Sequence, residues 1–170
     1  LHLQAGDEVL TTNHEHSGGM ICWQYLAKHH GVSMKYLKLP KIVDSADQIL
    51  KLIEQNLTER TRVCSLSHID TITGMQMPLA AISAITRSRN ILLVCDGAQA
   101  PGMLDVDVKA LGVDTYASSS HKWMLAPRGS GLLYIRREVR DRVRPIMFHK
   151  VDSEDHDYSA YGASSGTRNM

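Results

Sequence analysis

Two residues, Lys122 and Asp96, could together carry out chemistry on an aldehyde cofactor. Lys122 lies in the segment Ser-Ser-Ser-His-Lys-Trp at residues 118–123, which follows a strand-like stretch and precedes a glycine-rich one. Asp96 ends a strongly apolar run further upstream. A lysine amine can condense with an aldehyde to form a Schiff base. A carboxylate at the end of a strand can keep the ring nitrogen of pyridoxal phosphate (PLP) protonated, which makes the ring an electron sink. The two groups, in this order, indicate an enzyme that uses PLP.

Strand-like and helix-like patterns alternate along the chain, and these elements must position the two residues. The apolar run 91–95 is typical of a parallel strand that is covered on both faces. Gly31 is expected to end one helix, a capping box at Ser45 to begin a second, and Pro78 to begin a third. The alternation predicts an α/β fold, a three-layer sandwich with a mostly parallel sheet. Strands are expected at 8–12, 34–39, 62–67, 91–95, 115–118 and 132–135, and helices at 18–30, 45–56, 78–86 and 138–144.

Candidate functional groups follow three of the expected strands. Asp96 and His68 each come directly after a strand, and His121 and Lys122 come soon after another. Ligands of open α/β sheets bind at the carboxyl ends of the strands. We therefore expect a site at that edge of the sheet, with His68 more structural than functional.

Composition limits the classes of partner. The 170 residues are 43% hydrophobic and 22% charged, which is typical of a soluble globular domain with a sizeable core. The net charge is +1 and no basic block occurs, which argues against nucleic acid as a partner. No apolar run approaches the roughly 20 residues of a membrane span, so no membrane partner is expected.

The cysteines and the chain ends give two further expectations. Cys22, Cys64 and Cys95 form no CxxC pair and lie in apolar surroundings, so we expect buried free thiols and a reducing, cytoplasmic location. The chain opens on Leu1 and stops at Met170 without a closing element, so residues 1–170 are interpreted as the middle of a larger protein.

Five short motifs resemble those of a known family and occur in its order. The motifs are Glu15-His16-Ser17, Ser67-His68 through Gly74, Asp96-Gly97-Ala98-Gln99, Ser119-Ser120-His121-Lys122 and Gly166-Thr167-Arg168-Asn169. On them the sequence resembles the class V aminotransferases, which are PLP enzymes of fold type I, and most closely the group containing isopenicillin N epimerase, cysteine desulfurases and selenocysteine lyase. The resemblance implies that residues 1–170 are the central part of the PLP-binding large domain, with an N-terminal segment and a C-terminal small domain outside this chain.

The resemblance implies catalytic roles for three residues. Lys122 would hold the cofactor covalently and then take the substrate's α-proton, and Asp96 would pair with the ring nitrogen. His16 would stack on one face of the ring, where its imidazole could also move protons near neutral pH. His14 lies two residues away and could share that face in an extended segment, but no other ligands complete a metal site with it, so no metal is expected.

The remaining implied contacts are with other parts of the cofactor. Ala98 would pack on the second ring face, and Gln99 would donate to the phenolic oxygen. Ser119 and His121 would bind the phosphate. Thr167 would reach the phosphate of a neighbouring subunit, which implies a homodimer. Thr71 departs from the asparagine that cysteine desulfurases carry at this position, which weakens a desulfurase reading.

The implied partner is a small-molecule substrate, an amino acid, and the fate of its carbanion decides the reaction. Epimerisation, carbon–sulfur lysis or desulfuration, and transamination all remain open. The form of residues 121–129, His-Lys-Trp followed by Ala-Pro-Arg-Gly, resembles the epimerase-like branch more than the desulfurases. A catalytically silent homologue is a further alternative, against which Lys122, Asp96 and Gln99 argue. A nucleotide-binding domain is disfavoured because no strand is followed by a G-x-G-x-x-G turn or a P-loop.

Overall fold

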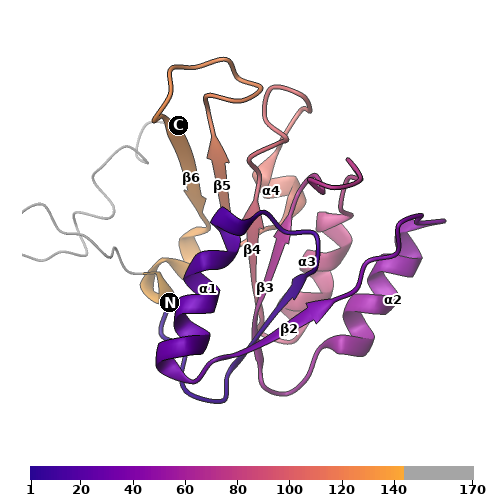
Figure 1. Cartoon of the computed structure of the whole chain (residues 1–170), viewed down its shortest axis with the longest axis vertical. Coiled ribbons are helices and arrows are strands. Elements are labelled where there is room, and N and C mark those ends of the chain that lie inside the picture. Colours follow the sequence, from indigo (N-terminus) through magenta and orange to yellow (C-terminus); the bar gives the residue numbers. More distant parts are fainter. Residues whose placement is uncertain (144–170) are drawn as a thin grey trace, which may run out of the picture.

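A six-stranded sheet forms the centre of the molecule in the computed structural model, which describes residues 1–143 (Figure 1). The strand order is β2-β1-β3-β4-β5-β6. Strands β2, β1, β3, β4 and β5 run parallel to one another, and β6 is antiparallel to β5. The bounds are β1 (Glu8–Thr12), β2 (Ser33–Leu37), β3 (Thr61–Ser67), β4 (Leu92–Asp96), β5 (Thr115–Ser119) and β6 (Gly131–Ile135).

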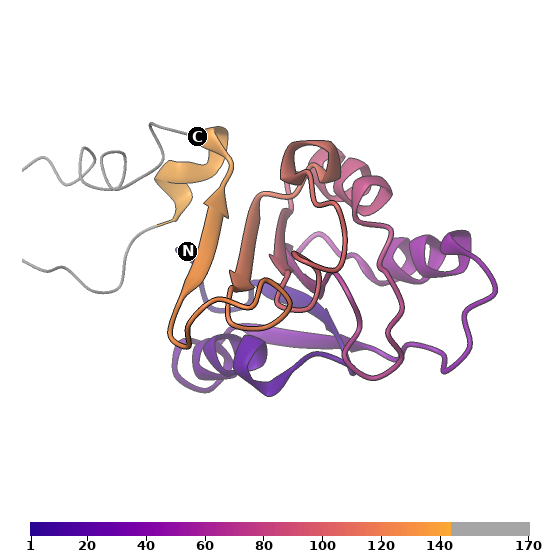
Figure 2. The same ribbon diagram turned by 90° about the horizontal axis from the view of Figure 1, so that it is seen from above.

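Helices cover both faces of the sheet, so the predicted three-layer α/β sandwich is confirmed (Figure 2). One apolar core lies between the sheet and α2 (Ala46–Asn56), α3 (Leu79–Ser88) and α4 (Val108–Leu111). A second core lies on the other face, where α1 (Ser17–His30) contributes Met20 and Trp23. A short 3₁₀ helix, η1 (Arg137–Arg142), adds Val139 to this second core.

The central strand β4 owes its place to its apolar sequence. It pairs with β3 on one side and β5 on the other, and Leu92, Leu93 and Cys95 are buried. Helix α1 ends as the sequence predicted, because Gly31 takes the left-handed conformation at φ +70° and its N–H bonds the Leu26 carbonyl. A glycine adopts this conformation without the steric cost that a Cβ imposes.

Three local expectations were wrong in detail. Ser45 lies at the N-cap of α2, but its side chain makes no capping hydrogen bond, and the Gln48 Oε1 instead accepts from the Asp44 N–H at 3.1 Å. The helix expected at 138–144 is the 3₁₀ helix η1. Helix α4 was not expected, because its four residues are too few to show a helical pattern.

The expectation that the cysteines are buried free thiols is confirmed for two of the three. Cys64 and Cys95 are buried and free, whereas Cys22 is exposed on α1. Burial raises the pKa of Cys64 to about 12 and raises that of Cys95 as well. No helix within residues 1–143 combines the length and the apolar character needed to cross a membrane.

Candidate active site

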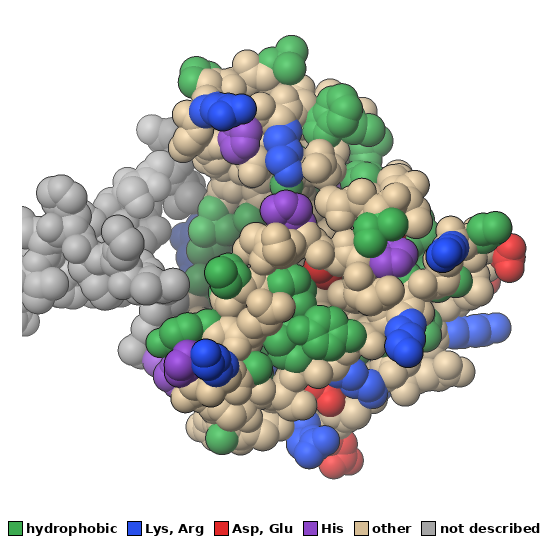
Figure 3. Space-filling view, viewed as in Figure 1, with side chains coloured by type: hydrophobic (Ala, Val, Ile, Leu, Met, Phe, Trp, Pro, Cys, Tyr) green, Lys and Arg blue, Asp and Glu red, His purple; other side chains and the backbone are tan. Residues whose placement is uncertain are grey.

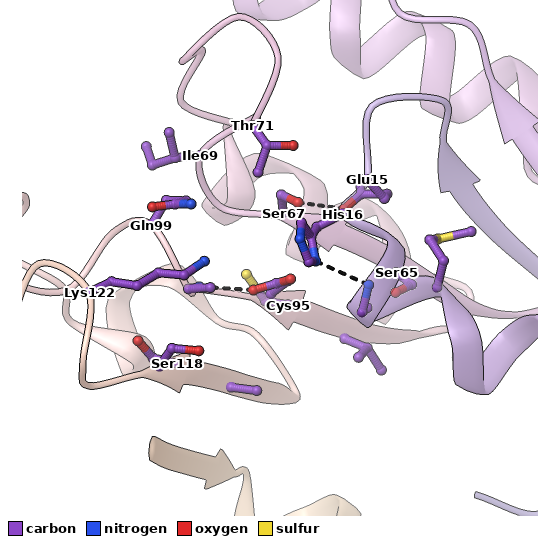
Figure 4. Close-up of a pocket in the computed structure, with 18 of the residues that line it drawn as sticks. Glu15, His16, Ser65, Ser67, Ile69, Thr71, Cys95, Gln99, Ser118 and Lys122 are labelled. Carbon is purple, nitrogen blue, oxygen red and sulfur yellow. Dashed lines mark hydrogen bonds between the residues drawn. The ribbon is translucent and has the colours of Figure 1, made fainter. Parts of the chain in front are cut away.

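A cavity of about 590 Å³ opens at the carboxyl ends of β1, β3, β4 and β5. The segments that follow these strands line it, together with the first turns of α1 (Figure 4). On the face drawn in Figure 3, histidine, basic and acidic side chains lie along the hollow between the loop that follows β5 and the rest of the molecule. All the predicted site residues within the described range line this cavity; they are His16, Thr71, Asp96, Ala98, Gln99, Ser119, His121 and Lys122.

The sheet order explains why these distant segments meet. Strand β1 lies between β2 and β3, so the chain changes direction across the sheet at β1, and a crevice forms at such a point. The register then aligns the strand ends, because Ser67 pairs with Asp96 and Asp96 pairs with Ala117. Four strand ends therefore place their following residues around one space.

Lys122 lies in the loop between β5 and β6, in a turn closed by its own backbone. Its N–H bonds the Ser119 carbonyl at 3.3 Å, and its carbonyl accepts from the Leu125 N–H at 3.1 Å. The side chain is partly buried and extends into the cavity from one side, while the His16 ring approaches from the other (Figure 4). The amine is thus the group that the β5 loop presents to the cavity.

Asp96 is the last residue of β4, and its carboxylate is oriented by the turn that follows. The Ala98 N–H donates to Oδ1 at 2.9 Å, and the Asp96 carbonyl accepts from the His68 N–H at 2.8 Å. Its Oδ2 lies against α1, since a Cβ built on Gly19 would be 3.3 Å from it. The carboxylate therefore stands between β4 and the start of α1.

Gln99 lines the cavity, and its amide is hydrogen-bonded by a residue that does not line the cavity. The Trp123 indole N–H donates to the Gln99 Oε1 at 2.9 Å. Because an indole N–H can only donate, its partner must be the amide oxygen, and the NH₂ group is the free end of the amide.

His16, and not His14, lines the cavity. His16 is the N-cap of α1, and its Nδ1 accepts from the Gly18 N–H at 3.1 Å. An accepting Nδ1 leaves the ring proton on Nε2 in the neutral form. His14 is buried, and its Nδ1 lies 2.7 Å from the Asp70 carboxylate, so its role is structural.

Glu15 also lines the cavity, and the sequence analysis gave it no role although it belongs to the same motif as His16. Ser67 and Thr12 donate hydrogen bonds to its two carboxylate oxygens. Burial raises the pKa of Glu15 above its ordinary value, and the charge of Asp96 acts in the same direction. Its place as the first residue of the motif Glu15-His16-Ser17 was the signal that could have found it.

Other predicted residues divide between the cavity and the core. Thr71 lines the cavity, but its hydroxyl donates to the His14 carbonyl at 2.9 Å. His68 is buried outside the lining and its Nδ1 lies 2.8 Å from the Tyr116 hydroxyl, which agrees with a structural role. Thr167 lies outside the described residues.

The large apolar side chains of α1 do not form one buried stripe. Met20 and Trp23 are buried and also line the cavity, whereas Tyr25 is exposed and its ring lies 4.7 Å from that of His29. A helical turn advances about 100° per residue, so residues 23 and 25 cannot face the same way.

A family model described as aminotransferase class V matches residues 1–168, nearly the whole chain. The chain belongs to this family. Isopenicillin N epimerase of Amycolatopsis lactamdurans is 34% identical over 99% of this chain and 44% of its own length. The epimerase of Streptomyces clavuligerus is 36% identical over 86% of this chain and 37% of its own. A probable cysteine desulfurase of Halalkalibacterium halodurans is 32% identical over 86% of this chain and 35% of its own.

Solved structures of PLP-containing and related enzymes share the fold. A mutant of the cystine C–S lyase C-DES, with glycine covalently linked to its PLP cofactor, superposes with a TM-score of 0.78 at 32% identity. The match covers 85% of this chain and 38% of that chain. The present chain spans less than half of the length of the curated relatives it matches.

Proposed function

We propose that the protein is a PLP-dependent class V enzyme that acts on an amino acid, in the manner of isopenicillin N epimerase. The observation that carries the proposal is the single cavity that Lys122, Asp96, Gln99 and His16 line together. An amine can hold PLP as a Schiff base and a carboxylate can pair with its ring nitrogen, and the amide and the imidazole line the same cavity. Membership of the class V family and the similarity to the epimerases support the same reading.

The residues present fit PLP. The cavity of about 590 Å³ is open enough for the ring and its phosphate, and Ala98 is a small side chain that leaves room at one side. The Asp96 carboxylate is oriented by the Ala98 N–H, and the Gln99 NH₂ group has no hydrogen-bond partner among residues 1–143. When bound, PLP would supply an electron sink for the carbanion formed at the α-carbon of an amino acid.

Lys122 would hold the cofactor covalently through Nζ and, once displaced by the substrate amine, would accept the α-proton on the same atom. His16, with its ring proton on Nε2, would stack on the ring and present a donor to the cavity. In an epimerisation a proton must return to the opposite face of the α-carbon, and Lys122 and His16 enter the cavity from opposite sides (Figure 4). An epimerisation could use both groups, one on each face of the α-carbon.

Asp96 would hold the ring nitrogen protonated. Its Oδ1 is fixed by the Ala98 N–H, so the carboxylate needs no reorientation on binding. Glu15 lies in the same cavity, and burial raises the pKa of its carboxyl group above the ordinary value.

Ser119 and His121 would donate to the phosphate, since both flank Lys122 and line the cavity. Thr71 donates its hydroxyl hydrogen to the His14 carbonyl, so toward a ligand its oxygen can act only as an acceptor. Thr167 would complete the phosphate site of a partner subunit in a homodimer. The buried free thiols Cys64 and Cys95 support a cytoplasmic protein.

A carbon–sulfur lyase is the second candidate function. The structural similarity to the cystine C–S lyase C-DES favours it. Product analysis with a panel of amino acids separates the candidates. Change of configuration at the α-carbon identifies an epimerase, and release of sulfur identifies a lyase. Formation of a keto acid with transfer of the amino group to an acceptor, and without release of sulfur, identifies an aminotransferase.

The cofactor itself is tested by reducing the PLP-loaded, full-length protein with borohydride and mapping its peptides by mass. We expect a phosphopyridoxyl group on Lys122, and its loss in Lys122→Ala. Lys109→Ala, which removes an exposed lysine of α4, is the matched control and should keep the group. Labelling of a different lysine, or no labelling of the folded protein in excess PLP, would refute the proposal.

A further inference from the structure

Trp123 contacts the candidate site from behind. Its side chain is half exposed and is not part of the cavity lining. Its indole N–H, however, donates to the amide oxygen of Gln99, and Gln99 does line the cavity. The two residues lie in different loops, Gln99 after β4 and Trp123 after β5. The hydrogen bond therefore joins the loop that follows Asp96 to the loop that carries Lys122.

Close backbone packing holds these two loops together. Gly102, at φ +93°, lies so near the Trp123 backbone that a Cβ on it would be 2.5 Å from the Trp123 carbonyl oxygen and 2.8 Å from the Met124 nitrogen. Only a glycine allows this approach and this conformation. The indole can consequently reach Gln99 while the preceding residue, Lys122, extends into the cavity.

The chemistry of the contact decides which end of the amide faces the cavity. A glutamine amide can turn by 180° and exchange its oxygen for its NH₂ group. The indole N–H can only donate. If the amide turned, its NH₂ group would face the indole N–H, two donors would meet, and the hydrogen bond would be lost. One hydrogen bond of ordinary net strength biases the two orientations by about two- to tenfold, with the NH₂ group toward the cavity.

We infer that Trp123 is a positioning residue, which fixes the Gln99 amide so that its NH₂ group donates to the phenolic oxygen of PLP. The inference rests on the proposed function, because it concerns the same cofactor. It also gives Lys122 and this donor a common support, since Lys122 and Trp123 are neighbours in one loop that is packed on the Gln99 loop.

The test is a double-mutant cycle in the full-length, PLP-loaded protein with Trp123→Phe, Gln99→Ala and the two changes combined. The readouts are the pH midpoint at which the cofactor's visible absorption band titrates and the dissociation constant of PLP. A donor to the phenolic oxygen withdraws electron density and lowers the basicity of the nitrogen beside it. Its loss should therefore move the midpoint to higher pH.

We expect Gln99→Ala to raise the midpoint and Trp123→Phe to raise it by a smaller amount, with PLP binding weakened about two- to tenfold in Trp123→Phe. The combined variant should match Gln99→Ala, because Trp123 acts only through the amide. Gln99→Glu keeps an acceptor for the indole but presents no NH₂ group, so it should shift the midpoint at least as far as Gln99→Ala. Tyr25→Phe, which alters an exposed aromatic outside the cavity, is the control and should leave the midpoint unchanged.

The outcomes separate the two proposals. A Trp123→Phe midpoint equal to that of the wild type, beside a shifted Gln99→Ala, overturns the inference and leaves the proposed function standing. If Trp123→Phe shifted the pH midpoint equally in the presence and absence of Gln99, the shift would be a packing effect. That result would also overturn the inference. Failure of the wild-type protein to bind PLP covalently overturns the proposed function and the inference with it.

Discussion

Replacing Gly97 by alanine should destabilise the fold and displace Asp96, because the position has no room for a methyl group. A Cβ there would lie 2.0 Å from the Tyr116 Cε1 and 2.1 Å from its Cζ. The Tyr116 ring cannot easily move away, since it is 4% exposed and its hydroxyl bonds the buried His68. The Gly97 backbone is also fixed, because its N–H bonds the Ala117 carbonyl at 2.7 Å.

The expected cost follows from these contacts. Overpacking of a close-packed core costs about 1–3 kcal/mol. If Tyr116 moves, His68 loses its Nδ1 partner, and its Nε2 has no partner among the described residues, so a buried imidazole without hydrogen bonds adds about 1–3 kcal/mol. Gly97→Ala should therefore lower the free energy of unfolding by about 2–6 kcal/mol.

Urea unfolding of the PLP-free protein measures this change, and PLP binding measures the displacement of Asp96. Gly6→Ala is the matched control, because Gly6 has φ +88° but nothing within 4 Å of an added Cβ, so only the backbone cost of about 1–2 kcal/mol applies. In a Tyr116→Ala background the Gly97→Ala change should cost much less, since the ring is gone. A cost no larger than that of Gly6→Ala, or one equal in both backgrounds, would refute the steric reasoning.

Two further predictions concern titration and thiol reactivity. Burial raises the pKa of Glu15 above its ordinary value of 4.5, so the folded state binds this proton more tightly than the unfolded state. The stability of the wild type relative to Glu15→Gln should therefore fall as pH rises from 4.5 through the raised pKa, as followed by urea unfolding at several pH values; a pH-independent difference would contradict this. With a thiol reagent such as DTNB, exposed Cys22 should react first and buried Cys64 and Cys95 only on unfolding, and equal rates in the native protein would speak against the described burial.

The elements that sequence predicted best are those whose burial is uniform. The run 91–95 has apolar side chains for both faces of the sheet, and it forms the central strand β4 within one residue. Gly31 marks the end of α1 because its conformation is specific to glycine. The prediction that Ser45 caps α2 through its side chain was wrong. The same local sequence also permits a hydrogen bond from the Asp44 N–H to Gln48, and the sequence alone does not select between the two arrangements.

Within the site, the sequence identified the side chains that line the cavity. It did not identify the residues that hold those side chains in place. Lys122, Asp96 and Gln99 were found because amine, carboxylate and amide are recognisable in a motif. The Gln99 partner, Trp123, was not found, since their hydrogen bond joins two loops whose packing depends on Gly102. His16 was already preferred to His14 on the resemblance, and in the structure the His14 ring is paired with the Asp70 carboxylate.

The spacing between Asp96 and Lys122 nevertheless carries physical information about the site. Residues 97–114 connect β4 to β5, and this crossover contains only the four-residue helix α4. A parallel connection needs about a dozen residues at least, and consecutive strands of a sheet are neighbours about two-thirds of the time. The spacing therefore favours adjacent strand ends for the carboxylate and the lysine, and the pairing of β4 with β5 bears this out. The approach of His16 is different, because β2 intervenes in sequence between β1 and β3, and the adjacency of β1 to β3 arises only from the reversal of strand order. Spacing thus favours the Lys122–Asp96 half of the cavity, while the opposing His16 face depends on topology.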